Sequence, residues 1–314
     1  MTARSVVLGA NGGTGRAVVE ALLAAGGDVL AVTRTGDGPE GAEQIAADVT
    51  DADGLGRALE GAEVVYQCAQ PAYERWARDF PAMNRTIAEA TATAGAKLVF
   101  ADNLYMYDPS QGPMRETTPE TPPTDRGRLR REMADELLAM HREGRLRVAI
   151  GRASDYYGPF GIGTSLGDRL FEAVIAGKKA QWMGSLDQPH TCSYLPDMAR
   201  ALVTLGTEDR ADGRAWVLPA APAITGRRFI ELASAAAGVP SRASAISPGM
   251  LRVAGLFSPM IRAYAEMLGE WTAPFTIDPS AFEAAFGPFD PTSHEEAIPA
   301  TVAWFSTRGA AKAA

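Results

Sequence analysis

The sequence predicts an α/β fold, in which a doubly wound parallel sheet is joined to a smaller, mainly helical C-terminal region. Over the first 150 residues, short apolar runs alternate with helical patterns, as in a parallel sheet covered on both faces. A glycine-rich turn at residues 9–15 separates the first apolar run from the first helical pattern. Beyond residue 155 the alternation weakens, and the 314 residues suffice for two unequal domains.

The first half of the chain supplies most of the expected sheet. Apolar runs of strand length predict strands at Ser5–Leu8, Val29–Thr33, Gln44–Ala47, Val64–Cys68, Leu98–Ala101 and Arg147–Gly151. Helical periodicity between them predicts helices at Thr14–Ala25, Thr50–Leu59, Phe80–Ala94 and Gly127–His141. A polar, proline-rich stretch at residues 108–125 precedes the last of these helices.

The second half is expected to be divided between the two domains. Helices are predicted at Asp168–Ala176 and Asp197–Leu205, a strand at Ala215–Leu218, and mainly helices with proline breaks over the last ninety residues, before a disordered tail at 309–314. We assign residues 1–155 to a nucleotide-binding domain to which 190–222 return. Residues 156–189 and 223–314 are assigned to a substrate-binding region.

Composition excludes several classes of partner. With 30 Lys+Arg against 38 Asp+Glu the net charge is −8, which argues against nucleic acid or an anionic membrane surface. No apolar run approaches the roughly 18 residues of a membrane span, and no signal peptide is apparent, so a cytoplasmic protein is expected. Cys68 and Cys192 are expected as free thiols rather than a disulfide, and no metal site is expected. Only four residues are lysine: Lys97, Lys178, Lys179 and Lys312.

The turn Gly9-Ala-Asn11-Gly12-Gly13-Thr14-Gly15 predicts a phosphate-binding loop. Glycines at this place let the backbone turn tightly, approach a pyrophosphate and pack a helix on a strand. The following helix offers free N–H groups and the positive end of its dipole to the phosphates.

Four further segments carry a resemblance to a known superfamily. They are Ala47-Asp48-Val49, Asn84, Arg152-Ala-Ser-Asp-Tyr-Tyr157-Gly-Pro159, and Ser193-Tyr-Leu-Pro-Asp197-Met-Ala199. With the Gly-x-x-Gly-x-x-Gly turn, the chain resembles short-chain dehydrogenases/reductases of the extended or atypical branch, which includes NAD-dependent epimerases and dehydratases. The resemblance implies a Rossmann-type fold, an Asp48 contact to adenine, and a place for Asn84 near the active site. The expected cofactor contacts are Gly9, Asn11, Gly12, Gly13, Thr14, Gly15, Arg34, Asp48, Val49, Cys68, Ala69 and Asn84.

The end of the second strand indicates which cofactor is bound. An acidic residue there would accept a hydrogen bond from the ribose 2′-hydroxyl of NAD, but this chain has Thr33-Arg34-Thr35. Because Arg34 can pair with a 2′-phosphate, we expect NADP. A merely solvated arginine is the alternative.

The superfamily's usual Tyr-x-x-x-Lys pair is missing, since no tyrosine has a lysine four residues later. By comparison with the family pattern, Gly127 falls at the tyrosine position, Arg131 at the lysine position and Asn103 at the catalytic serine position. We therefore predict Tyr105 as the proton donor, with Asn103 and Arg131 beside it and His190 or Asp155 as alternatives. In the competing interpretation, Tyr105 and Tyr107 are packing residues and no hydride transfer occurs.

The substrate site is expected to be apolar. Nucleotide-sugar members of the superfamily carry an Asn and an Arg where this chain has Asp155 and His190, and an ionised Asp155 would repel a diphosphate. Large apolar residues are frequent in the substrate region, including a run from Met250 to Trp271. The expected substrate contacts are Tyr107, Asp155, Tyr156, Trp182 and Met183.

These features predict an NADP-dependent oxidoreductase that reduces a carbonyl or polarised double bond of a hydrophobic small metabolite. Two alternatives stay open: an epimerase, dehydratase or cyclising isomerase on the same fold, and a non-catalytic NADP-sensing protein. The resemblance also leaves a homodimer open.

Overall fold

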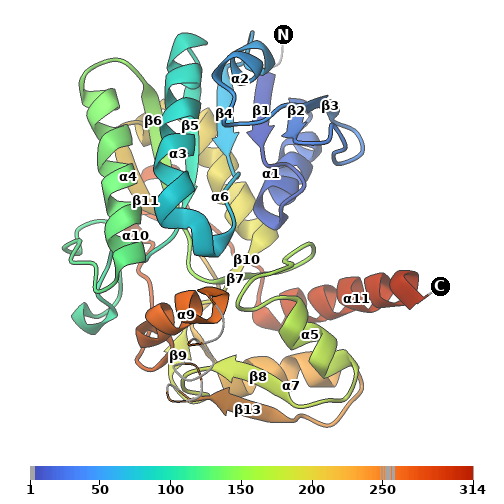
Figure 1. The fold of residues 1–314 in the computed structure, drawn as a ribbon. Coiled ribbons are helices and arrows are strands. Elements are labelled where there is room, and N and C mark those ends of the chain that lie inside the picture. Colours follow the sequence, from blue (N-terminus) through green and yellow to red (C-terminus); the bar gives the residue numbers. More distant parts are fainter. Residues whose placement is uncertain (1–3, 248, 250, 252–255, 257–258, 314) are drawn as a thin grey trace.

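Seven parallel strands form the central sheet of the computed structural model, which describes residues 4–247, 249, 251, 256 and 259–313. Their order is β11-β6-β5-β4-β1-β2-β3, so the chain reverses direction across the sheet between β1 and β4 (Figure 1). This is the predicted Rossmann-type fold, with its ligand crevice at the switch point. The strands are β1 (Arg4–Leu8), β2 (Asp28–Thr33), β3 (Glu43–Ala46), β4 (Val64–Gln67), β5 (Lys97–Asp102), β6 (Arg147–Arg152) and β11 (Arg214–Val217).

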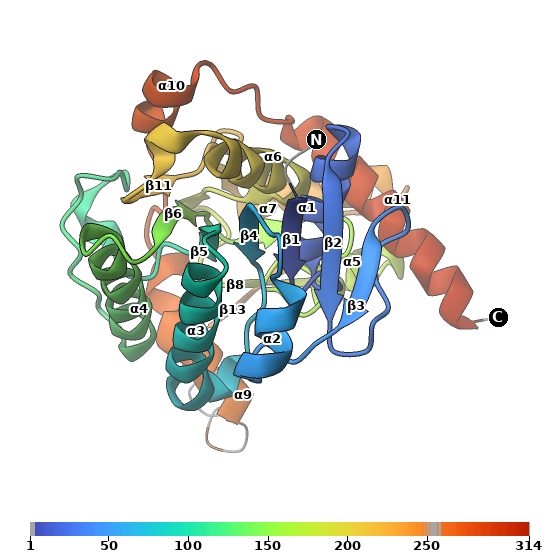
Figure 2. The same cartoon turned by 90° about the horizontal axis from the view of Figure 1, so that it is seen from above.

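Helices cover both faces of the sheet (Figure 2). One face carries α2 (Ala52–Ala58), α3 (Trp76–Thr93) and α4 (Asp125–Arg142), and the other carries α1 (Gly13–Ala24) and α6 (Leu195–Thr207). Each layer has its own apolar cluster, because the strand side chains point alternately to the two faces: Val6 and Leu8 to one, Val7 to the other.

The remaining elements form a smaller layer beneath the carboxyl ends of the strands (Figure 1). Its helices are α5 (Asp168–Ile175), α7 (Gly226–Ala236), α9 (Pro259–Glu266) and α11 (His294–Ala313), while α10 (Ser280–Phe286) packs beside β11. Short two-stranded pairings complete it: β7 (Tyr156–Tyr157) with β10 (Ser193–Tyr194), β9 (Pro189–His190) with β12 (Ile224–Thr225), and β8 (Ala180–Met183) with β13 (Ala243–Ile246). The core of this layer is aromatic, with Phe171, Trp182, Phe229 and Trp271 buried together.

Several element boundaries differ from prediction. The third helix begins at Trp76 rather than Phe80 and carries Pro81 inside it, and Leu195 rather than Asp197 begins α6. The tail predicted to be disordered continues α11 to Ala313. The short strands of the lower layer were not predicted, and part of the apolar run from Met250 to Trp271, including Met250 and Phe257, lies outside the described residues.

Polar groups in the fold are largely paired. Lys97, which starts β5, is buried, and its ammonium lies 2.6 Å from Asp212 and donates to the Glu208 carbonyl at 2.8 Å. Both cysteines are free thiols.

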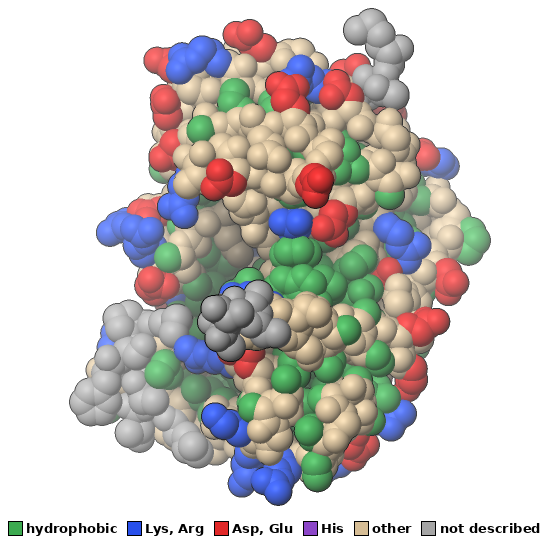
Figure 3. Space-filling model, turned by 90° about the vertical axis from the view of Figure 1, so that its right-hand side faces the viewer, with side chains coloured by type: hydrophobic (Ala, Val, Ile, Leu, Met, Phe, Trp, Pro, Cys, Tyr) green, Lys and Arg blue, Asp and Glu red, His purple; other side chains and the backbone are tan. Residues whose placement is uncertain are grey.

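When the molecule is viewed along α11, apolar side chains gather near mid-height on the face toward the viewer (Figure 3). No helix in the described part of the chain is long and apolar enough to cross a membrane.

Candidate active site

The glycine-rich turn has the close approach that its sequence predicts. Gly9 has φ +78°, a left-handed conformation that favours glycine. A Cβ on Gly15 would overlap the Gly9 carbonyl oxygen, so α1 can pack against the turn only with glycine there. Gly12 precedes the first residue of α1, and the helix N-terminus therefore faces the crevice.

A groove of about 1040 Å³ runs from this turn across the carboxyl ends of the strands. Asp48 lies just after β3, where its carboxylate accepts hydrogen bonds from the Thr50 N–H (2.9 Å) and hydroxyl (2.7 Å). These bonds lower the pKa of Asp48. Predicted cofactor residues that line the groove are Gly9, Asn11, Gly12, Gly13, Thr14, Arg34, Asp48, Val49, Cys68 and Ala69. The glycine turn, where a Cβ on Gly15 would overlap the backbone, and the acidic residue after β3 fit a dinucleotide.

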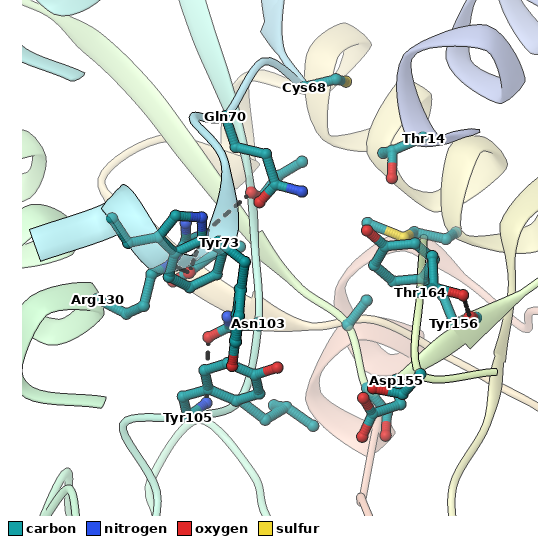
Figure 4. Close-up of a pocket in the computed structure, with 18 of the residues that line it drawn as sticks. Thr14, Cys68, Gln70, Tyr73, Asn103, Tyr105, Arg130, Asp155, Tyr156 and Thr164 are labelled. Atoms are coloured by element: carbon teal, nitrogen blue, oxygen red, sulfur yellow. Dashed lines mark hydrogen bonds and ion pairs between the residues drawn. The ribbon is translucent and has the colours of Figure 1, made fainter. Parts of the chain in front are cut away.

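A second, smaller cavity of about 240 Å³, called the inner cavity below, lies beside the groove (Figure 4). Its lining is rich in aromatic rings: Tyr73, Trp76, Phe80, Tyr105, Tyr156, Tyr264 and Phe275. Asn103, predicted as a catalytic residue, and Asp155, predicted as a substrate contact, also line it. In Figure 4, Tyr73, Tyr105 and Arg130 stand on one side of the cavity, and Thr14, Tyr156 and Asp155 on the other.

Tyr105 and Tyr73 are neighbours on the same side of this cavity. Their hydroxyls share a hydrogen bond, and burial raises the pKa of both phenols. Asn103 accepts a hydrogen bond from the Tyr105 N–H at 3.2 Å through its side-chain oxygen, which fixes the loop after β5. Both phenols are therefore protonated at neutral pH and can donate but not readily accept a proton.

Arg130, not Arg131, reaches the cavity. Arg131 is exposed on α4, where it lies 3.5 Å from Asp135 and donates to the Glu120 carbonyl, so its predicted catalytic place is wrong. Gly127 could not be replaced by a tyrosine here, because even a Cβ would overlap the Tyr105 carbonyl oxygen. The N-terminal end of α4 thus packs directly on the loop that carries Tyr105.

The Arg130 guanidinium belongs to a buried ion network. It donates to Asp102 at 2.7 Å and is stacked over the rings of Trp76, Phe80 and Phe100. Arg152 lies on the other Asp102 oxygen at 3.4 Å.

The predicted substrate residue Tyr107 belongs to the same network. Its hydroxyl accepts a hydrogen bond from Arg152 at 2.6 Å, and its ring is buried outside both cavities. The prediction for Tyr107 is therefore wrong.

Two carboxylates line the cavity: Asp102, which is paired with Arg130, and Asp155, which has His190 behind it. The His190 Nε2 is 3.0 Å from the Asp155 carboxylate, and its ring is stacked between Trp271 (4.1 Å) and Phe275 (4.9 Å). His190 lines neither cavity and contacts the site through Asp155. Nearby Glu270 is buried, and burial, with the charge of Asp155, raises the pKa of its carboxyl.

Comparison with known proteins places this site in a family. A model of the NAD dependent epimerase/dehydratase family matches residues 5–218, which is most of the chain. The chain belongs to this family. Among curated proteins no sequence matches.

Solved structures of sugar epimerases share the epimerase/dehydratase fold with this chain. A nucleoside-diphosphate-sugar epimerase from Pseudomonas aeruginosa is similar with a TM-score of 0.78 at 18% identity, over 98% of this chain and 99% of that chain. A UDP-N-acetylglucosamine 4-epimerase from Bacillus cereus gives 0.78 at 15% identity, over 98% and 97%. The UDP-glucose 4-epimerase from Thermus thermophilus, solved in complex with NAD, gives 0.75 at 19% identity, over 96% and 99%.

Four further predicted residues lie away from both cavities in this member of the epimerase/dehydratase family. Asn84 is fully buried in α3 and accepts a hydrogen bond from Gln67 at 3.2 Å, so it packs beneath β4 rather than lining the groove. Trp182 and Met183 belong to the aromatic core of the lower layer. Gly15 supports the turn without lining the groove.

Four residues that line the inner cavity were not predicted from the sequence as site residues: Gln70, Tyr73, Trp76 and Arg130. Thr124 caps α4, and its hydroxyl accepts a hydrogen bond from the Gly127 N–H at 3.0 Å. Because a cap fixes where a helix starts, Thr124 was the sequence signal from which the inward direction of Arg130 could have been predicted. Tyr73 and Trp76 precede the predicted start of α3 and carried no periodic signal.

Proposed function

We propose that this member of the epimerase/dehydratase family is an NADP-dependent oxidoreductase that reduces the carbonyl or polarised double bond of a compact hydrophobic molecule. The observation that carries the proposal is the aromatic cavity of about 240 Å³ that shares a wall with the cofactor groove. When bound, the cofactor would supply hydride there. The protein would hold the substrate and supply the proton.

The size and charge of the cavity favour a single-ring, uncharged substrate. Ligand pockets usually measure about 300–1000 Å³, and this cavity is smaller than that range. Among its described lining residues the cation is Arg130, which is already paired with Asp102. A nucleoside diphosphate would find the carboxylate of Asp155 in place of a free cation.

The protonation of the cavity favours reduction over oxidation. Reduction requires a proton donor, and the lining holds the phenols of Tyr73, Tyr105 and Tyr156, which are protonated at neutral pH. Epimerisation by transient oxidation would begin with a base that removes a hydroxyl proton. Asp155 with His190 offers such a base, and the family membership also favours this second candidate.

The groove supports the choice of NADP. Arg34 lies on its lining directly after β2, at the position where an acidic residue would select NAD. Arg75 and Arg78 also line the groove, but both lie on Asp79, at 3.6 and 2.6 Å. Arg34 is therefore the better partner for a 2′-phosphate.

Fluorescence titration with NADPH and NADH tests the cofactor. We expect NADPH to bind at least about tenfold more tightly, since a charge-assisted hydrogen bond contributes about 1.5–3 kcal/mol. Arg34→Ala should abolish this preference, whereas Arg57→Ala on the exposed face of α2 should keep it. Equal affinities in the wild type would contradict NADP specificity.

Absorbance at 340 nm tests the reaction. The wild-type enzyme should oxidise NADPH in the presence of single-ring ketones, aldehydes and enones such as acetophenone, benzaldehyde and cyclohexenone. Conversion of a UDP-sugar with no net change in cofactor would instead establish the epimerase. Cofactor binding with neither reaction would favour the sensing alternative.

A further inference from the structure

The wall between the groove and the inner cavity is the place where hydride and proton must meet. Six residues line both spaces: Thr14, Cys68, Ala69, Gln70, Pro71 and Tyr156. In a fold of this strand order a dinucleotide lies across the switch point, with its adenine half over β2. Because Arg34 and Asp48 mark the adenine end, the nicotinamide would lie at this shared wall.

Three of the shared residues carry a transferable proton. Burial raises the pKa of the Cys68 thiol to about 12, and an aliphatic hydroxyl such as that of Thr14 is a still weaker acid. Tyr156 has a phenol, whose pKa is raised by burial, while hydrogen bonds from Gln70 and Thr14 act in the opposite direction. Tyr156 is the aromatic hydroxyl on the wall that both spaces share, and two neighbouring side chains hold its oxygen there.

The hydroxyl of Tyr156 is held by two neighbours. It forms hydrogen bonds with the side chains of Gln70 and Thr14, and both bonds lower its pKa against the raising effect of burial. The Gln70 amide and the Thr14 hydroxyl thus act as donors to the phenolic oxygen, which leaves the phenolic proton available to the cavity. Thr14 is in the first turn of α1, whose dipole favours negative charge.

Tyr105, the donor predicted from sequence, is less well placed. It lines the inner cavity but not the groove, and its hydroxyl forms a hydrogen bond with Tyr73. Both tyrosines lie on the side of the cavity opposite Tyr156 (Figure 4). Tyr73 and Tyr264 likewise line the inner cavity alone.

We propose that Tyr156 is the general acid of this site, donating its phenolic proton to the substrate oxygen at the shared wall, with Gln70 and Thr14 as positioning residues. This inference rests on the proposed reductase function. In the step, hydride adds to the carbonyl carbon and the Tyr156 proton to its oxygen, so the C=O π bond breaks and an alcohol forms. The dinucleotide held in the groove would supply the hydride and leave oxidised, and the Tyr156 phenolate would regain a proton from solvent through the Thr14 hydroxyl.

Tyrosine-to-phenylalanine variants separate the candidates. With NADPH and the best ketone of the panel, Tyr156→Phe should lower kcat about 100-fold or more while the Kd of NADPH changes less than about threefold. Tyr105→Phe should lower kcat less than about tenfold. Tyr194→Phe is the matched control, since this half-buried tyrosine lines neither cavity and should retain wild-type turnover.

A second readout needs no turnover. In protein labelled with ¹³C at the tyrosine ζ carbon, the signal that disappears in Tyr156→Phe should shift when NADP⁺ is added, and by more than the Tyr105 signal. Loss of this shift in Gln70→Ala, with NADP⁺ still bound, would support the positioning role.

The outcomes distinguish the inference from the function beneath it. If NADPH binds and ketones are reduced, but Tyr156→Phe keeps turnover or the Tyr156 signal does not move, the assignment of Tyr156 is overturned and the reductase stands. If no NADPH binds to the wild type, the proposed function itself fails. If NADPH binds without turnover, the labelled-tyrosine signal alone decides whether Tyr156 meets the cofactor.

Discussion

Asp102 is held between two guanidinium groups in the interior of the protein. Its side chain is fully buried, with Arg130 on one oxygen at 2.7 Å and Arg152 on the other at 3.4 Å. Neither arginine can lose its charge at physiological pH, so Arg130 depends on this carboxylate for compensation, while Arg152 is compensated by Asp102 together with Glu120 at 2.6 Å.

Asp102→Asn should lower the free energy of unfolding by about 3 kcal/mol, because it leaves two buried cations without their shared anion. Urea denaturation measures the change. Asp135→Asn is the matched control, since this exposed carboxylate lies 3.5 Å from exposed Arg131 and should contribute less than about 0.5 kcal/mol. A loss at Asp102 no larger than that of the control would show that the network is not stabilising.

The same arginines show what limits prediction at the scale of single residues. The sequence places a cation near the sheet on α4, but which of Arg130 and Arg131 turns inward depends on where the helix starts. A shift of one residue rotates a side chain by about 100° around the helix. Tyr156 was predicted as a substrate contact, but its hydrogen bonds with Thr14 and Gln70 join segments distant in sequence and carried no local signal.

At the scale of elements, the glycine-rich turn and α1 act as one unit. Gly15→Ala would place a methyl group against the Gly9 carbonyl oxygen, which is backbone and cannot give way without moving the turn. We expect NADPH affinity to fall at least about tenfold and stability by about 1–3 kcal/mol, as for other overpacked sites.

Gly56→Ala provides the contrast for this turn. Gly56 lies within α2, and a Cβ there would meet no atom within 4 Å. This variant should leave NADPH affinity unchanged and raise stability by up to about 1 kcal/mol, because alanine favours helix. Fluorescence titration and thermal unfolding measure both variants, and an unaltered NADPH affinity in Gly15→Ala would contradict the role of the turn.

Most strands of the central sheet were predictable because they are buried apolar runs between helical patterns, whereas the edge strand β3 is exposed along its whole length. The short pairings of the lower layer were not, since two-residue strands such as Tyr156–Tyr157 have no periodicity of their own. They form only when segments far apart in sequence are brought together, as β7 and β10 are. The helix start at Trp76 was missed because Pro81 usually marks a boundary, although α3 tolerates it.

At the scale of the whole molecule, His294 connects α11 to β7 and to the segment before β12. Its Nε2 donates to the Pro222 carbonyl at 3.0 Å, and its Nδ1 therefore accepts from the Tyr157 hydroxyl at 2.9 Å. Both bonds use the neutral ring, and burial lowers the pKa of His294.

This linkage predicts a pH dependence of stability. The unfolded chain protonates His294 below a pH of about 6.5, whereas the folded protein resists protonation, so the stability present at neutral pH is lost as pH falls. Between pH 7.5 and 5 the wild type should lose stability relative to His294→Gln, by at most about 1.4 kcal/mol per pH unit. Urea denaturation across this range checks it, and parallel curves for the two proteins would exclude the effect.

The pairing of Lys97 with Asp212 has a practical consequence for attaching the protein to a support. With that amine buried in the sheet, exposed lysine side chains occur at Lys178 and Lys179, between α5 and β8 in the lower layer. Amine-directed coupling through these two side chains would attach the molecule through its lower layer, away from the amino ends of the central strands. Because neither lysine lines the cofactor groove or the inner cavity, a tethered protein would keep both spaces open to solution.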